Sequence, residues 1–300
     1  MPNLKDIERR ISSVKSTRQI TSTMQMIAAA KVAKSASRLQ ESMPYTSAIS
    51  EMLVSVSEGS SDVLHPLLVE HENKKTALVI VVVSDKGLAG GFNSNILREV
   101  QHIINKNNSQ GKNTKIIACG KKAKGYFDFR NIPLEMEFAG SSDNPQFDQA
   151  EEIGNYCIEG YKNSEIDEVI LVYNKCKNSM EQTVENKLIL PCTAQDLVDA
   201  AQQTAKQEGS EYLKEIVYEP DTKSVLESLI PTYIRTLIFN ALLDSAAGEQ
   251  VARRVAMQAA TDNADEMTET LTRLYNSVRQ GAITTELNEI VGGAEALSSE

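Results

Sequence analysis

The segment from Ser84 to Asn93, Ser-Asp-Lys-Gly-Leu-Ala-Gly-Gly-Phe-Asn, carries the residue types of a nucleotide-binding loop. It follows an apolar run and opens a predicted helix, which is where phosphate-binding loops of α/β proteins lie. Its glycines, however, are spaced G-x-x-G-G, and neither G-x-G-x-x-G nor G-x-x-x-x-G-K-[ST] occurs in the chain. We therefore expect a tight structural turn here, with nucleotide binding as the weaker alternative.

Other catalytic chemistry has little support in the sequence. The histidines His65, His71 and His102 are scattered, and none sits in a recognisable catalytic sequence. The four cysteines form no C-x-x-C pair, which argues against a zinc site or a disulfide framework and for a reducing compartment. Glu151 and Glu152 lie on a predicted helix and are typical of a solvated face. We expect no catalytic residue, no cofactor and no metal.

The charge is unevenly distributed along the chain. The net charge is −10, yet residues 1–40 hold eight Lys or Arg against two acidic side chains, and residues 223–300 hold six basic against eleven acidic. Opposite charges at the two ends favour antiparallel pairing of these segments, although two unrelated solvated faces would give the same counts. No aromatic residue is interleaved among the basic residues of the N-terminal segment, so nucleic-acid binding is not expected.

Both ends of the chain predict long helices. The helical pattern covers about the first 55 residues and about Ser224 to Ala296, where Ser224 to Glu227 fits a capping box. At about 1.5 Å per residue these helices would be roughly 80 Å and 100 Å long. Helices of this length cannot bury themselves in a compact domain, so they must pack on each other or inside a partner.

The first helix carries a heptad seam that breaks in its middle. Leu4, Ile7, Ile11 and Val14 follow steps of three and four residues, which is typical of a coiled coil. Between Arg18 and Gln25 the seam positions are polar, and a second apolar face and a slim alanine segment appear there: Ile20, Met24, Ile27 and residues 28–30. This pattern favours a helix that is contacted from outside as well as by its mate; ordinary drift of the seam is the alternative.

Between the two helices the pattern predicts a small α/β domain. Apolar β-branched runs such as Ala77–Val83 alternate with amphipathic helices, which indicates a mostly parallel, Rossmann-like sheet. The third strand is expected at Ile132–Phe138. We place an N-terminal coiled-coil helix at 1–57, a linker at 58–75, the α/β domain at 76–219 and a C-terminal coiled-coil helix at 220–300. No apolar stretch is long enough to span a membrane, and the N-terminal segment reads as mature protein.

Several segments together resemble the gamma subunit of F-type ATP synthase. They cover the whole chain in family order, and the last of them is a specific signature: Ile11–Lys31, Ser84–Asn93, Ala259–Ala264, Leu274–Gln280 and Ile283–Ala294. The resemblance implies an antiparallel coiled coil of the two terminal helices around which the alpha and beta subunits form a hexamer. It also implies contacts of the α/β domain with the epsilon subunit and the c-ring.

The function that the resemblance implies is that of a rotor. One copy per complex would couple proton flow through the membrane ring to ATP synthesis or hydrolysis in the beta subunits, with no catalytic residue of its own. The complex would lie at the cytoplasmic face of a bacterial plasma membrane, and the chain would be peripheral to it. The alternatives are a Rossmann-like nucleotide-binding enzyme with helical dimerisation arms, and a coiled-coil scaffold or DNA-associated protein.

The resemblance also implies which residues contact partners. Met24, Gln25 and Ile27 would face an acidic segment of the beta subunit that acts as a lever, called the acidic lever below. Arg279 and Gln280 would form hydrogen bonds with a loop of the beta subunit. Arg253 would be a further contact on the same helix. The helix tip would sit in an apolar bearing, and the foot of the protein would contact the ring or epsilon: Ile290, Val291, Ala294 and Leu297 for the tip, Tyr218 and Glu219 for the foot.

The sequence departs from the family pattern at several positions. Lys86 stands where the family commonly has Arg, and Ala89 where it has Cys or another small residue. On the C-terminal helix, family Met, Lys, a basic residue and Ala are replaced by Arg254, Gln258, Ser277 and Gly281 respectively. The last three changes remove positive charge or stiffness, which puts in doubt the strength of individual contacts but not the resemblance. The dithiol insertion of chloroplast members is missing.

Overall fold

The structure is a computed structural model that describes residues 3–58, 65–72, 74–176, 178, 181–192 and 221–298. Its contacts divide the chain into two compact units. One unit contains residues 1–28 and 254–300, and the other contains residues 29–253. Helices α1 (Leu4–Glu58) and α6 (Thr222–Ser298) each contribute to both units, and each unit is described by itself.

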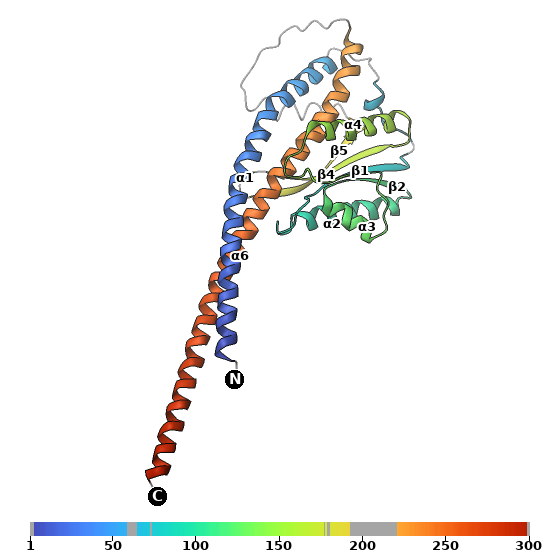
Figure 1. Ribbon diagram of the computed structural model, residues 1–300. Helices are drawn as coiled ribbons and strands as arrows, with labels where there is room; N and C mark the ends of the chain where they lie inside the picture. Colours follow the sequence, from blue (N-terminus) through green and yellow to red (C-terminus); the bar gives the residue numbers. More distant parts are fainter. Residues whose placement is uncertain are drawn as a thin grey trace. The chain divides into compact units, whose positions relative to one another are not determined.

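The larger unit contains a five-stranded sheet in the order β3-β2-β1-β4-β5. Strands β1 (Thr76–Val82), β2 (Asn113–Cys119), β3 (Met136–Phe138) and β4 (Glu168–Cys176) are parallel, and β5 (Gln182–Leu190) runs antiparallel to β4. The expected α/β class with a mostly parallel sheet is therefore confirmed. The sheet carries helices on both faces, as Figure 1 shows.

The central strand β1 explains how the two faces are filled. Successive side chains of a strand point to opposite faces, so Leu78, Ile80 and Val82 enter one apolar cluster, while Val79 and Val81 enter the other. The first cluster also contains side chains of α4 (Phe147–Lys162), α1 and α6. The second is covered by α2 (Phe92–Ser109) and α3 (Lys121–Phe129). This two-sided burial accounts for the unbroken apolar run in the sequence.

Two details of the predicted elements were wrong. The third strand covers only Met136–Phe138 instead of beginning at Ile132, because Pro133 has no N–H to donate to a neighbouring strand. Helix α6 begins at Thr222, and its start is capped by Asp221 rather than by Ser224. The Asp221 carboxylate accepts hydrogen bonds from the backbone N–H and the hydroxyl of Ser224, both at 2.9 Å.

Part of the stretch expected to be a linker is ordered. Residues Pro66–Leu68 form a short 3-10 helix, η1, which the His65 side chain caps by accepting a hydrogen bond from the Leu67 N–H. Leu67 is fully buried in the first apolar cluster. The four-part division of the chain stays a prediction.

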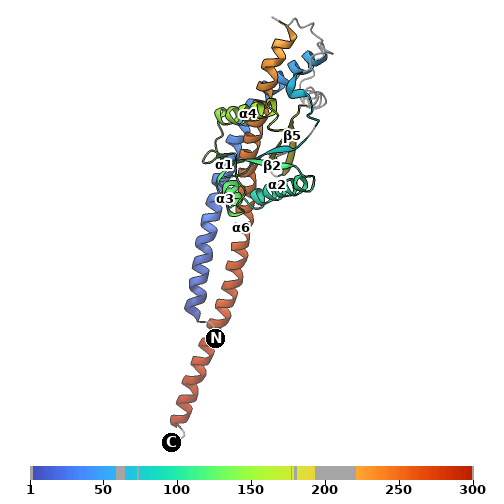
Figure 2. The same cartoon turned by 90° about the vertical axis from the view of Figure 1, so that its right-hand side faces the viewer.

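In the smaller unit, α1 and α6 run antiparallel to each other. Arg18 pairs with Asp265, and Thr21 with Thr261, so contacts that advance along α1 recede along α6. Ile7, Met257 and Ala264 are buried in this unit. Figures 1 and 2 both show α6 continuing past the N-terminal end of α1. Across the described residues, no helix is long and apolar enough to cross a bilayer.

The turn from β2 into α3 depends on one glycine. Gly120 has a φ of +105°, and a Cβ added there would lie 2.2 Å from the Val83 carbonyl oxygen. We expect Gly120→Ala to lower the free energy of unfolding by about 3 kcal/mol or more, through backbone strain and the clash. Urea denaturation of the purified chain measures this change.

Gly125 provides the matched control within α3. A Cβ added there meets nothing within 4 Å, so Gly125→Ala should raise the free energy of unfolding by about 0.5–1 kcal/mol. Equal stability of the two alanine variants would contradict the geometry of this turn.

Candidate partner-binding surfaces

The first predicted surface lies on α1. Ile27 is 54% exposed, Met24 and Gln25 are half-buried, and the nearby apolar side chains of Ile20 and Met26 are also exposed. Their exposure leaves an apolar face of α1 uncovered by the chain itself. Such a face is typical of a surface that a partner covers.

The polar break in the seam faces the mate helix. The hydroxyl groups of Thr21 and Thr261 lie 2.8 Å apart and are buried, and the Arg18 guanidinium donates to the Asp265 carboxylate. The polar seam residues Arg18 and Thr21 therefore bond within the helix pair. The apolar residues Ile20 and Ile27 beside them remain exposed.

The second predicted surface is the end of α6. Arg279 and Gln280 are exposed, and so is every residue from Gly281 to Ala294. Four large apolar residues in this stretch follow helical spacing, Ile283, Leu287, Ile290 and Val291, with Ile290 61% exposed. The antiparallel register brings the start of α1 close to position 279, and the described part of α1 does not extend along the exposed stretch.

The structure describes the remaining predicted contact residues to different extents. Ala294 is exposed on the same helix, and Leu297 lies within its last turns. Tyr218 and Glu219 lie outside the described residues. All of these assignments stay predictions.

Arg253 does not lie on an open surface. It is only 7% exposed, and its guanidinium donates to the Glu249 carboxylate, to the Gln250 side-chain oxygen at 2.9 Å, and to the Gly87 carbonyl at 3.4 Å. The surface contact that the resemblance implies for Arg253 differs from this placement. The guanidinium is already bonded to groups of the same chain because α6 packs against the loop after β1.

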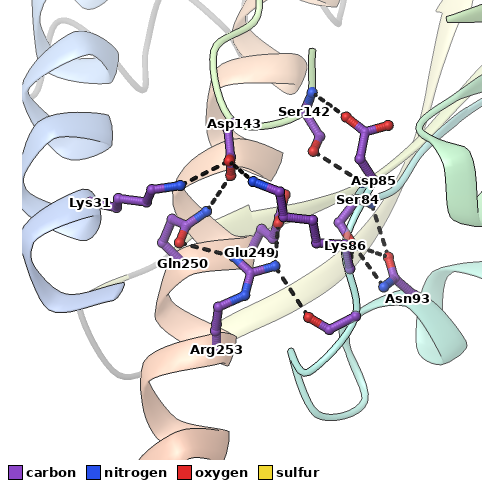
Figure 3. A network of polar contacts seen from close by, with 11 residues as sticks. Lys31, Ser84, Asp85, Lys86, Asn93, Ser142, Asp143, Glu249, Gln250 and Arg253 are labelled. Atoms are coloured by element: carbon purple, nitrogen blue, oxygen red, sulfur yellow. Dashed lines mark hydrogen bonds and ion pairs between the residues drawn. The ribbon is translucent and has the colours of Figure 1, made fainter. Parts of the chain in front are cut away.

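Arg253 belongs to a charged junction centred on Asp143 (Figure 3). The Asp143 carboxylate accepts hydrogen bonds from Lys31 of α1 at 2.8 Å, from Lys86 of the loop after β1 at 2.7 Å, and from Gln250 of α6 at 2.8 Å. Gln250 also links Asp143 to Arg253, because its amide nitrogen donates to one and its amide oxygen accepts from the other. One carboxylate therefore joins two helices and two loops of the larger unit.

The electrostatics of the junction follow from its pairings. Burial alone would raise the pKa of Asp143, but the hydrogen bonds from Lys31 and Lys86 outweigh it and lower that pKa to about 2. Burial raises the pKa of Glu249, and the Arg253 guanidinium opposes this shift. Asp143 is thus held as the charged partner of two ammonium groups.

The loop after β1 is bonded to neighbouring loops through its Asp85 side chain. The Asp85 carboxylate accepts hydrogen bonds from the backbone N–H groups of Lys121, Gly140 and Ser142, at 2.9 to 3.0 Å. The Lys121 N–H opens α3, and such groups bind phosphate in nucleotide sites. The Asp85 carboxylate therefore fills the start of α3. Within the loop that opens α2, the Ser84 N–H donates to the Asn93 side-chain oxygen at 2.9 Å, in agreement with the expected structural turn.

Two buried cysteines are held as protonated thiols. Burial raises the pKa of the Cys119 thiol to about 12 and also raises that of Cys157, which keeps both from acting as thiolates. In the part of the chain that the structure covers, no three His, Cys, Asp or Glu residues come together as metal ligands.

The chain contains two antiparallel helices whose apolar faces are partly uncovered, and an α/β domain whose loops are bonded to side chains of the same domain. These features are typical of a structural subunit of a larger assembly. The sequence matches the family described as ATP synthase over residues 3–297. It is 38% identical over 305 residues to the sodium ion specific ATP synthase gamma chain of Acetobacterium woodii, covering 99% of both chains. It is 39% identical over 301 residues to the ATP synthase gamma chain of Chlorobaculum tepidum, again covering 99% of each.

Solved structures agree with this match. A chain of the central stalk and c-ring of the Tetrahymena thermophila mitochondrial ATP synthase is 26% identical, with a TM-score of 0.59 over 80% of this chain and 99% of that one. A chain of the Euglena gracilis mitochondrial enzyme shares the fold with a TM-score of 0.65 at 17% identity, over 98% and 94% of the two chains. The chain belongs to the ATP synthase gamma chain family, as the sequence predicted.

Sequence reasoning missed the junction. Asp143 stands in a Ser-Asp-Asn-Pro turn, and its donors lie 57 to 112 residues away in the sequence. No local pattern links these positions. The only signal was the basic Lys31 at the end of the slim alanine segment.

The lowered pKa of Asp143 makes a prediction about stability. A carboxyl whose pKa falls on folding contributes stability above its unfolded value, near 3.8 for Asp, and this contribution is lost as the pH falls through the folded value. We expect Asp143→Asn to lower the free energy of unfolding by about 1 kcal/mol at neutral pH, a figure that allows for solvent screening of the two lysines. The difference from wild type should vanish between about pH 4 and pH 2.

Urea titrations of the purified chain at several pH values test this. Glu137→Gln serves as control, because Glu137 pairs with Lys124 on the surface of the α/β domain, away from the Asp143 hydrogen bonds. A difference between Asp143→Asn and wild type that stays constant down to pH 2 would contradict the linkage.

Proposed function

We propose that the chain is the central rotor stalk of an ATP synthase and couples ion flow through a membrane ring to ATP synthesis or hydrolysis. The family match over nearly the entire chain is the observation that carries the proposal. Its partners would be the alpha and beta subunits, the epsilon subunit and the c-ring, with one copy of this chain per complex. The chain itself would be non-catalytic and peripheral to the membrane, at the cytoplasmic face of a bacterial cell.

The uncovered end of α6 supports this assignment. Most helical stability in proteins comes from packing of an apolar face rather than from propensity, and Gly281, Gly292 and Gly293 each lower the stability of this end by up to about 1 kcal/mol relative to alanine. Burial of each exposed apolar side chain in a partner would return about 1.5 kcal/mol or more. A surrounding collar of subunits would therefore stabilise this end.

The exposed face of α1 supports the contact with the beta subunit. Met24 and Ile27 present apolar surface beside the helix pair, and an acidic lever that moves against this face could transmit force in either direction. Arg279 adds a planar guanidinium suited to carboxylates. Rotation would then present these groups to each catalytic subunit in turn.

The enzyme alternative lacks this support. The family match is to a gamma chain, and the glycine spacing of Ser84–Asn93 fits neither phosphate-binding motif. Purification of a tagged chain from its native membrane tests the proposal directly. We expect two larger subunits in equal amounts, each in excess over this chain; recovery of the chain alone or as a homodimer would contradict the proposal.

Arg279→Ala should impair coupling without unfolding the chain. Loss of one charge-assisted hydrogen bond worth about 1.5 kcal/mol corresponds to roughly a tenfold decrease in ATP synthesis and in ATP-driven pumping. Membrane vesicles carrying the variant complex, assayed for proton pumping and for sodium uptake, measure the effect.

Arg273→Ala is the matched control for Arg279→Ala. Arg273 is exposed on the same helix and pairs with Glu269 of its own chain, so its loss should change pumping less than about twofold. Normal pumping by the Arg279 variant would refute its role.

Met24→Lys should weaken coupling by adding a charge contact to the acidic lever. We expect fewer ions transported for each ATP hydrolysed, at about half the wild-type ratio or less, since a charge-assisted bond holds the two surfaces together. Thr23→Lys adds the same charge at a neighbouring exposed position and should leave the ratio unchanged. An unchanged ratio in both variants would count against the placement of Met24.

A further inference from the structure

We propose that the Asp143 junction is a clamp that makes the α/β domain turn together with the helix pair under load. The inference rests on the proposed rotor function. It concerns residues 29–253 only, and it assigns a mechanical role to Asp143, Lys31, Lys86 and Gln250. These residues position the domain and contact no substrate.

The need for a clamp follows from how α1 is packed. No residue of α1 from Ala29 to Ala48 is buried, and these positions cover about 30 Å of helix at about 1.5 Å per residue. The apolar contacts of α1 with the first cluster begin only at Ile49 and continue with Leu53 and Val56. Along the stretch before Ile49, polar contacts hold α1 to the rest of the unit.

Most of these polar contacts converge on one loop, whereas Thr46 accepts a hydrogen bond from Asn240 of α6 at 2.7 Å. Lys31 donates to Asp143, and Arg38 donates to the Asn144 side chain and to the Pro145 carbonyl, the latter at 2.9 Å. The same loop is held from the sheet side, because Asp85 accepts from the N–H groups of Gly140 and Ser142. The loop therefore connects α1 to the carboxyl ends of the parallel strands.

The other helix reaches the same carboxylate through buried groups. Gln250 and Glu249 are 2% and 1% exposed, and they bond Asp143 and Arg253 respectively. Arg253 in turn reaches the Gly87 carbonyl in the loop after β1. Figure 3 shows Lys31 and Gln250 approaching Asp143 from the two helices. A force on α6 is thus transmitted through Gln250 and Asp143 to α1 and the sheet.

Hydrogen bonds suit this task better than apolar packing does. Apolar packing resists sliding where buried side chains interdigitate, and α1 has no buried residue from Ala29 to Ala48. Hydrogen bonds depend steeply on angle and distance, so three of them on one carboxylate resist sliding and twisting. Loss of the carboxylate would also leave the Lys31 and Lys86 ammonium groups, both bonded to the same oxygen, to repel each other.

The test compares loaded and unloaded rotation in the assembled complex. Asp143→Ala removes the carboxylate at the centre of the junction, and Asp143→Asn keeps its shape without the charge. Glu137→Ala removes a carboxylate of the same domain that pairs with Lys124. ATP hydrolysis by the soluble F1 part reports unloaded rotation. ATP synthesis at a limiting ion gradient and ATP-driven pumping in vesicles report loaded rotation, each normalised to the amount of assembled complex.

We expect Asp143→Ala to leave unloaded hydrolysis within about twofold of wild type and to lower synthesis and pumping at least about threefold. Asp143→Asn should lie between the two, and Glu137→Ala should match wild type in every assay. Coupling in Asp143→Ala equal to wild type would overturn the clamp. Parallel loss of hydrolysis, synthesis and assembly would also overturn it, because that result describes a folding residue.

Failure of the proposed function would look different. In that case the wild-type chain would fail to restore pumping to vesicles that lack their gamma subunit. A torsion measurement adds an independent readout, with a bead attached through a cysteine introduced at exposed Gln110 in the turn between α2 and β2. We expect the angular variance of the bead to rise at least about twofold in Asp143→Ala and to stay unchanged in Glu137→Ala; unchanged variance in both would overturn the clamp.

Discussion

A pair of helices can bury only a narrow stripe of each member, and the rest of the structure depends on this limit. In the smaller unit the buried stripe includes Ile7, Thr21, Met257 and Ala264, while large apolar side chains beside it remain exposed. Two helices alone cannot supply the burial that such length requires. The α/β domain supplies it for one part of each helix, and partner subunits would supply it for the other.

The larger unit combines two kinds of contact with different physical properties. The apolar cluster around Leu53, Ile234 and Ile153 gives most of the free energy of packing. The charged junction around Asp143 adds little to that free energy, because its lysines are half-exposed, but it fixes geometry. Most of the packing free energy and the directional hydrogen bonds thus come from different parts of one interface.

The sequence predicted the elements better than their contacts. The apolar run of β1 and the periodic ends of the chain were sufficient for the sheet and for α1 and α6, since periodicity is a local signal. The third strand is shorter than predicted because of Pro133, and Asp221 rather than Ser224 caps α6. The exposed residues Ile27 and Ile290 could be named from the sequence, whereas the burial of Arg253 could not, because its partner Gly87 is 166 residues away.

The buried hydroxyl pair of Thr21 and Thr261 has a consequence for the paired helices as a transmission. A slide of one helical turn would set Thr21 beside Met257 or Ala264 in place of Thr261. The two hydroxyl groups would lose the contact between them and keep only their bonds to carbonyls of their own helices. This penalty opposes sliding of one helix along the other. A displacement applied at one end of the helix pair would then reach the other end without slippage between the helices.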